Sequence, residues 1–201
     1  MFWIDHIPFE KADSSLKKIY NRIKGPNNKI DNILMVHSLR PHTLTGHMSL
    51  YKNVLHNTNN TLPTWYLEAL GVYVSFLNQC DYCVDHHFAG LQKLWNDPEK
   101  SKEFYKALKQ NSIETFFDKK WSMGFTYANL LSKNPIKISK KNIQNLKDLG
   151  FSDGEILEIN QVVSYFNYAN RTVLGLGVNI HGDVLGLSPN DSENAENWNH
   201  Q

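Results

Sequence analysis

The stretch LEALGVYVSFLNQCDYCVDHH, residues 67–87, joins a strongly apolar segment to the two cysteines of the chain, Cys80 and Cys83. The larger apolar segment, TWYLEALGVYVSFLN at 64–78, predicts a central helix, because it is apolar on nearly every face. One acid, Glu68, interrupts it, and a buried acid is costly unless it is paired. We therefore expect Glu68 either to hydrogen-bond a polar group of the core or to exchange protons with the cysteine site.

Helical periodicity continues on both sides of this stretch. Apolar residues recur at offsets of three and four, which is typical of amphipathic helices. Pro135 and Gly150 fit helix ends, and Ser152 with Glu155 fits a capping box. Strict alternation over several residues is hard to find, so we predict an all-α fold. The expected helices, besides 64–78, are 12–23, 41–56, 101–110, 120–133, 138–150 and 154–177.

Length and composition indicate one compact domain. A chain of 201 residues that is 41% hydrophobic can bury one sizeable core. We assign residues 1–187 to a helical domain and residues 188–201, SPNDSENAENWNHQ, to a polar tail that is mobile unless a neighbouring subunit holds it. A formal charge of +1 gives no broad field that would attract nucleic acid or an anionic membrane. Function is therefore expected at a local site.

The expected location is the cytoplasm. Asp5, Pro8 and Glu10 break the apolar run that a signal peptide needs, and no run of about 18 apolar residues is present. In a reducing compartment, two cysteines two residues apart indicate catalysis, redox sensing or metal binding rather than a structural disulfide. A bridge that closes so short a loop would also restrict the unfolded chain very little.

The spacing of the cysteine stretch suits redox chemistry. On a helix, Cys80, Cys83 and His87 fall within an arc of roughly 60°, whereas His86 points roughly 100° away from His87. Cysteines three apart have Cα atoms about 5 Å apart, within the range that a disulfide tolerates. A nearby imidazole and a helix N-terminus lower the pKa of a thiol, and the thiolate is the reactive form.

The pattern of Glu68, Cys80, Cys83 and His87 resembles the signature of the alkyl hydroperoxidase D family, within the carboxymuconolactone decarboxylase-like superfamily. Three segments resemble its longer, peroxidase-related branch: HSLRP (37–41), CDYCVDHHFAGL (80–91) and FSDGEILEINQVVSYFNYANRTVLGLGV (151–178). The resemblance implies an all-helical fold in which the cysteine helix packs on the helix that carries the glutamate. It also implies a homo-oligomer, either a trimer or a hexamer.

The resemblance further implies a peroxidase that needs neither a metal nor an organic cofactor. Cys83 is then the peroxidatic cysteine, Cys80 the resolving thiol, and Glu68 with His87 the proton relay. The substrate is a hydroperoxide, and the partner is a dithiol reductant of lipoyl or thioredoxin-like type. Tyr82 stands where the best-known members have a histidine, and a phenol cannot replace imidazole as a base near neutral pH.

Other readings stay open. Cys80, Cys83 and His87, with Glu68 or His86, could bind zinc, although no second ligand pair is present. A redox sensor or disulfide oxidoreductase without efficient turnover is a second alternative, and a muconolactone decarboxylase is a third that the paired cysteines disfavour. We place His37, His42, His47 and His56 mostly at the surface or at an interface. Asn170 and Arg171 are expected to fix helix packing or a subunit contact.

Overall fold

The computed structural model describes residues 2–25, 28–187 and 198, and these residues contain helices and no strand. The prediction of a single all-α domain is confirmed. The α-helices are α1 Ser14–Ile23, α2 Asn32–Met35, α3 Pro41–Leu55, α4 Thr64–Leu77, α5 Asp81–Trp95, α6 Pro98–Lys109, α7 Lys119–Lys133, α8 Lys140–Asp148 and α9 Asp153–Leu176. Short 3-10 helices, η1 Phe9–Lys11, η3 Val36–Leu39, η4 Ile113–Thr115 and η5 Pro135–Lys137, join some of them.

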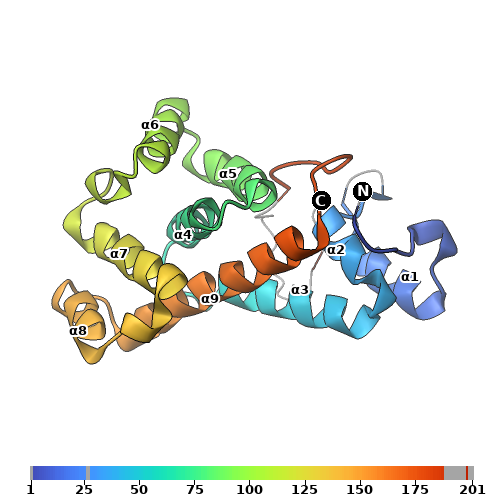
Figure 1. Cartoon of the computed structure of the whole chain (residues 1–201), viewed down its shortest axis with the longest axis horizontal. Coiled ribbons are helices and arrows are strands. Elements are labelled where there is room, and N and C mark those ends of the chain that lie inside the picture. The colour runs from blue at the N-terminus through green and yellow to red at the C-terminus, as the bar shows by residue number, and fades with distance from the viewer. Residues whose placement is uncertain (1, 26–27, 188–197, 199–201) are drawn as a thin grey trace.

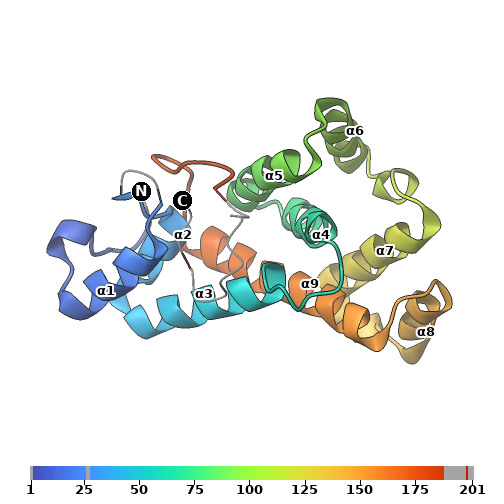
Figure 2. The same cartoon turned by 180° about the vertical axis from the view of Figure 1, so that it is seen from behind.

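Helix α4 is the central element, as its apolar sequence predicted. It packs against α5, α7, α9 and α3, and ten of its residues are buried. Figure 1 shows α9 running from the end of the molecule that holds α7 and α8 to its middle, with α1 to α3 towards the other end. From behind, α3 lies along α9 (Figure 2). The core therefore forms where α4 meets α9, and α5 covers the next face of α4.

The predicted helix ends are confirmed where the sequence carried a specific signal. Helix α7 ends at Lys133, just before Pro135, and Gly150 follows the end of α8 with a φ of +86°. At the start of α9 the Ser152 backbone N–H donates to Glu155 Oε2 at 2.7 Å, and the Glu155 N–H donates to Ser152 Oγ at 3.2 Å. This reciprocal pair is the capping box that the sequence predicted. Local sequence therefore fixes where α9 begins, and α9 carries one wall of the site.

Residues 188–197 and 199–201 of the predicted tail lie outside the described residues, so its mobility stays a prediction. Trp198 is described, and its side chain is buried. The guanidinium carbon of Arg22, on α1, lies 3.9 Å from the centre of the Trp198 ring. This part of the predicted tail therefore contacts the helical domain.

Close packing between α4 and α9 depends on Gly71. A Cβ atom at this position would lie 2.1 Å from Cε2 of Phe166, a side chain that is itself fully buried. Phe166 also meets the His87 ring edge-on, with 4.6 Å between ring centres. Gly71 therefore lets the Phe166 ring pack close against α4, and this ring in turn contacts His87.

We expect Gly71→Ala to lower the free energy of unfolding by about 1–3 kcal/mol, because overpacking a buried contact forces neighbouring groups to shift. Urea unfolding measures this change. The matched control is Gly46→Ala on α3, where nothing lies within 4 Å of the added Cβ. That control should be neutral or more stable, since alanine favours a helix over glycine by about 0.5–1 kcal/mol. Equal stability of the two variants would contradict the packing argument.

Candidate functional site

The turn between α4 and α5 places Cys80. Asn78 ends α4, and Gln79 adopts a left-handed backbone with a φ of +57°, which reverses the chain within three residues. The Cys80 N–H then donates to the Ser75 carbonyl at 2.9 Å, and the Cys80 carbonyl accepts the first helical hydrogen bond of α5 from Val84 at 3.0 Å. Cys80 is therefore the N-cap residue of α5, and Cys83 lies in its first turn.

The two sulfur atoms face each other. Their separation is 2.9 Å, longer than the bond of about 2.05 Å in a disulfide, so the pair is a dithiol in close contact. Cys80 is 0% exposed and Cys83 is 3% exposed. They belong to a small apolar cluster with Val36, Tyr82, Val173 and Val178 that is separate from the main core. The predicted proximity of the two thiols near a helix N-terminus is thus present.

Asn170 of α9 holds this turn in place. Its Nδ2 donates to Ser75 Oγ at 3.1 Å, and its Oδ1 accepts from Asn78 Nδ2 at 2.9 Å. Its side chain also lies beside the two cysteines, where it opposes in small part the burial that raises the pKa of Cys83. The expected role of Asn170 in helix packing is confirmed. Arg171, by contrast, is exposed, and its guanidinium donates to the backbone and side-chain oxygens of Asn167, one turn earlier in α9.

The two thiols differ in acidity. The Cys83 thiol lies close enough to donate to the Cys80 sulfur, and this hydrogen bond lowers the pKa of Cys80. Burial raises the pKa of Cys83 well above its usual value, and the charge on Cys80 raises it further. A single negative charge on the pair therefore rests on Cys80, while Cys83 keeps the shared proton.

Glu68 and His87 form a hydrogen-bonded pair beside the cysteines. His87 Nδ1 lies 2.8 Å from Glu68 Oε2, and the carboxylate is fully buried. Because the carboxylate accepts, Nδ1 donates, and Nε2 is left as the nitrogen that can exchange a proton. The sequence predicted Glu68 and His87 as partners, and the structure brings them together from adjacent helices.

A second imidazole, His56, also approaches Glu68. His56 Nε2 lies 3.6 Å from Glu68 Oε1, the oxygen that faces away from His87, and the His56 side chain is only 7% exposed. The surface or interface placement of His56 and of His47 was therefore wrong. His47 lies on α3 and is buried, with its Nε2 3.4 Å from the Tyr165 hydroxyl, and His56 directly follows the end of this helix. His42 is exposed as expected, and His37 is half-buried.

A pocket opens beside Cys83 and not beside Cys80. Its lining includes Cys83, both histidines of the cysteine helix and three tyrosines, of which Tyr165 has a pKa raised mainly by burial. The rest of the lining is largely apolar, which suits a small organic molecule. The lining residues are Asp31, Ile33, Leu34, His47, Met48, Tyr51, Tyr82, Cys83, His86, His87, Tyr165, Ala169, Gly186 and Leu187.

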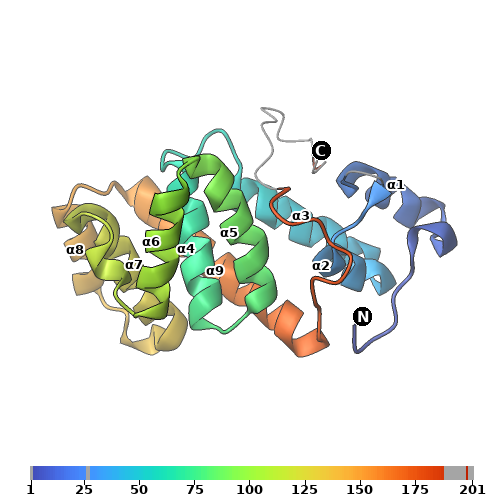
Figure 3. The same cartoon turned by 90° about the horizontal axis from the view of Figure 1, so that it is seen from above.

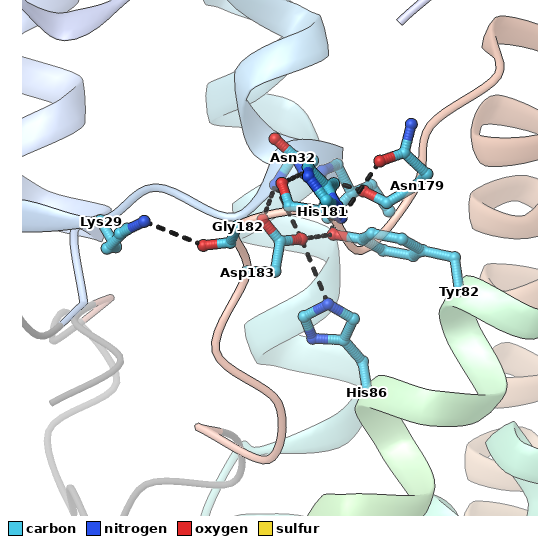
Figure 4. Close-up of polar contacts among 9 residues, drawn as sticks. Lys29, Asn32, Tyr82, His86, Asn179, His181, Gly182 and Asp183 are labelled. Carbon is cyan, nitrogen blue, oxygen red and sulfur yellow. Dashed lines mark hydrogen bonds and ion pairs between the residues drawn. The ribbon is translucent and has the colours of Figure 1, made fainter. Parts of the chain in front are cut away.

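His86 reaches this pocket by a different route from His87. The sequence placed it away from the cysteine face, and it indeed does not bond Glu68. Its Nε2 instead lies 3.2 Å from Asp183 Oδ2, on the segment that follows α9. Tyr82 donates its hydroxyl to the same oxygen at 2.7 Å (Figure 4). Burial and the neighbouring Asp183 raise the pKa of Tyr82, so this phenol is a hydrogen-bond donor rather than a base.

Sequence reasoning missed Asp183 and His56. Asp183 lies in an irregular segment about a hundred positions after Tyr82, and no periodic pattern connects the two. His56 caps the C-terminal end of α3, outside the helical pattern that Met48 and Tyr51 share, so periodicity did not place it either. Within the described residues, no three His, Cys, Asp or Glu side chains are grouped to hold a metal ion. Nor is any helix described there both long and apolar enough to cross a membrane.

No family model matches the chain. It is 24% identical to Sestrin-2 from Homo sapiens and to Sestrin-2 from Bos taurus, in each case over 186 residues and 91% of this chain. The aligned region covers 36% of the human protein and 37% of the bovine one, so this chain spans about a third of the length of these relatives.

Several solved structures match the fold of this chain. A peroxidase-related protein from Ralstonia eutropha, described as an alkylhydroperoxidase AhpD core, superposes with a TM-score of 0.74 at 16% identity, covering 89% of this chain and 91% of that one. A peroxidase-related protein from Silicibacter gives a TM-score of 0.68 at 20% identity, covering 88% and 87%. A debrominase in complex with 2,3,4-tribromopyrrole gives 0.63 at 14%, covering 85% of each chain. The chain therefore has the alkyl hydroperoxidase D-like fold of the peroxidase-related proteins, as its sequence predicted.

Proposed function

We propose that the protein is a thiol-dependent hydroperoxidase that works through a dithiol and disulfide cycle. One observation carries the proposal: two sulfurs lie 2.9 Å apart, one of them in the wall of a largely apolar pocket that is also lined by His87, the hydrogen-bond partner of Glu68. The fold supports a peroxidase-like role in general terms. The assignment of each residue to a step is our inference.

In the first step, Cys83 attacks because it is the sulfur that faces the pocket. The single negative charge of the pair rests on Cys80, and when the Cys83 proton shifts to the Cys80 thiolate the charge moves to Cys83. This thiolate attacks one oxygen of the hydroperoxide, so that an S–O bond forms and the O–O bond breaks. Cys83 becomes a sulfenic acid, and the other oxygen leaves as an alkoxide.

The relay of Glu68 and His87 delivers the proton that the alkoxide needs. His87 donates from Nε2, and the buried carboxylate of Glu68 orients the ring through its hydrogen bond to Nδ1. His56 lies on the other side of the same carboxylate, with its Nε2 3.6 Å from Glu68 Oε1. The products of the step are an alcohol and a sulfenic acid.

In the second step, Cys80 traps the sulfenic acid. The Cys80 sulfur bonds to the Cys83 sulfur, and the sulfenic hydroxyl leaves as water with the proton that Cys80 had received. An external dithiol, of lipoyl or thioredoxin-like type, then reduces the disulfide by thiol exchange and is itself oxidised to a disulfide. The cycle consumes one hydroperoxide and two thiols of the reductant, and it yields an alcohol and water.

The proposal extends to assembly and location. A trimer or hexamer and the cytoplasm stay predictions from the resemblance and from the sequence. Light scattering of the purified protein measures the oligomeric state, and a monomer in solution would contradict the predicted trimer or hexamer.

Turnover distinguishes this enzyme from the alternatives. The reduced protein should lose two thiols per hydroperoxide consumed and continue to turn over when dihydrolipoamide is supplied. A redox sensor would be oxidised once and then stop. A zinc protein would contain stoichiometric metal after purification without chelator. A tribromopyrrole assay tests the chemistry of the debrominase, and bromide release without peroxide consumption would contradict the proposal.

Replacing Glu68 by glutamine should slow the first step by roughly 10²-fold or more, which is the usual contribution of a positioned acid or base. Glutamine keeps the size of the side chain and an oxygen that accepts from His87, so the helices should retain their packing. Stopped-flow loss of thiols on mixing with hydroperoxide measures the rate. Glu103→Gln, an exposed position on α6, is the matched control. An unchanged rate in a folded Glu68→Gln variant would remove the relay from the mechanism.

A further inference from the structure

The segment after α9 folds back over the cysteine helix. We call residues 178–187 the strap. Gly177, with a φ of +65°, ends α9 and turns the chain, and the strap then runs between α5 and α2 (Figure 3). Asn32 of α2 donates its side-chain amide to the carbonyls of Asn179 at 2.8 Å and His181 at 3.1 Å. Lys29 donates to the Gly182 carbonyl at 3.1 Å.

Asp183 is the main attachment point of the strap. Its side chain is only 2% exposed. Its carboxylate oxygens accept from the Asn32 backbone N–H at 3.1 Å and from the Tyr82 hydroxyl at 2.7 Å, and one of them lies 3.2 Å from His86 Nε2 (Figure 4). Hydrogen bonds to a charged group are stronger than those between neutral groups. This carboxylate therefore binds the strap to both α2 and α5.

The far end of the strap forms part of the pocket wall. Gly186 and Leu187 line the same pocket as Cys83. Gly186 packs on α5 so closely that an added Cβ would lie 3.0 Å from the Ala89 Cβ, and its φ of +69° also favours glycine. Lys93 donates to the Gly186 carbonyl. The strap is thus fixed by polar contacts at Asp183 and by close packing at Gly186.

We propose that the strap selects the hydroperoxide, with Asp183 as the positioning residue that holds it closed. The inference rests on the proposed function for the identity of the substrate. With the strap in place, Cys83 is 3% exposed, so a small peroxide can reach the sulfur while a bulky one must displace Gly186 and Leu187 first. Local opening of the strap, at a free energy set largely by the Asp183 contacts, then limits bulky substrates.

Thiol labelling tests this proposal without any turnover. N-methylmaleimide and N-pyrenylmaleimide carry the same reactive group and differ in size. In the reduced protein, Asp183→Ala should raise the labelling rate of Cys83 by the pyrenyl reagent about tenfold or more relative to the methyl reagent, because each lost charged hydrogen bond favours the open form. Asp183→Asn should show the same trend less strongly, and hydrogen exchange at 178–187 should accelerate in both variants.

Controls separate opening from thiol acidity. A change in thiol pKa would speed both reagents equally, so an unchanged ratio of the two rates overturns the proposal, as does unaltered hydrogen exchange in the strap. Asp148→Asn, an exposed position on α8, should leave the ratio as in the parent protein. Gly186→Ala displaces the wall without altering Asp183 and should also raise the ratio. The labelling experiment measures the opening of the strap even if the protein does not turn over peroxide, so the two proposals can fail separately.

With an active protein, the same variants should change substrate preference. The kcat/KM for cumene hydroperoxide relative to hydrogen peroxide should rise about tenfold in Asp183→Ala, in parallel with the labelling ratio. A ratio that stays constant while labelling changes would show that the strap gates reagents but not substrates, and would overturn its role in selection.

Discussion

Replacing Cys83 by serine is expected to abolish hydroperoxide consumption, with a loss on the order of 10³-fold or more relative to the parent protein. Cys83 is the sulfur in the pocket wall, and a hydroxyl neither forms a comparable nucleophile near neutral pH nor accepts oxygen from a peroxide. Peroxide consumption in the presence of excess dihydrolipoamide measures the loss. Thermal unfolding should change little, since serine is close in size to cysteine.

The same variant also tests which sulfur attacks. Cys80 is the more acidic thiol, yet it is fully buried and does not line the pocket. We assign the attack to Cys83 because it lines the pocket, although Cys80 is the more acidic thiol. If Cys83→Ser consumed hydroperoxide at the rate of the parent protein, Cys80 would be the attacking cysteine and the order of the two steps would be reversed.

Replacing Cys80 by serine should permit one oxidation and then stop. Cys83 can still attack, but no thiol lies within reach to convert its sulfenic acid to a disulfide. One equivalent of hydroperoxide should therefore be consumed, followed by a steady-state rate near zero. Dimedone labelling followed by mass spectrometry should locate the sulfenic acid on Cys83. Sustained turnover equal to that of the parent protein would show that an external thiol performs the second step.

The Cys80→Ser variant should also shift the pH dependence of that single oxidation. Burial raises the pKa of Cys83, and without Cys80 no neighbouring sulfur accepts its proton. The rate should therefore keep increasing as pH rises past about 8.5, the ordinary pKa of a thiol, because more thiolate forms. The parent protein should level off at a lower pH, since the pKa of Cys80 is lowered. Identical profiles would contradict the proton shift between the sulfurs.

Local patterns in the sequence predicted most of the helices and the two cysteines proposed for the chemistry. Periodicity identifies a helix such as α9, and the Ser152 and Glu155 box fixes its start, because these signals act over a few residues. Helical spacing likewise brings Cys83 and His87 to one side of α5. The pair of Glu68 and His87 required more, namely the resemblance to a family in which two helices meet.

The residues that the sequence did not assign depend on long-range packing. His56 is placed by the end of α3, and Asp183 by a turn after α9, so both reach the site from segments that pattern analysis treats independently. Asn170 was expected to fix helix packing or a subunit contact, and nothing in FNYANRT indicates that its amide lies beside the cysteines. Burial decides these roles, and burial at irregular segments follows from the whole fold rather than from local periodicity.

The attachment of the strap to Tyr82 across 101 positions has a consequence for biosynthesis. A ribosome adds about 5–20 residues per second, so several seconds separate the emergence of the cysteine helix from that of Asp183. During that interval the nascent protein presents two neighbouring thiols without their cover. Oxidants and thiol-containing molecules in the cell can reach the two cysteines most easily during this interval. Once the strap has folded over the cysteine helix, this access is reduced.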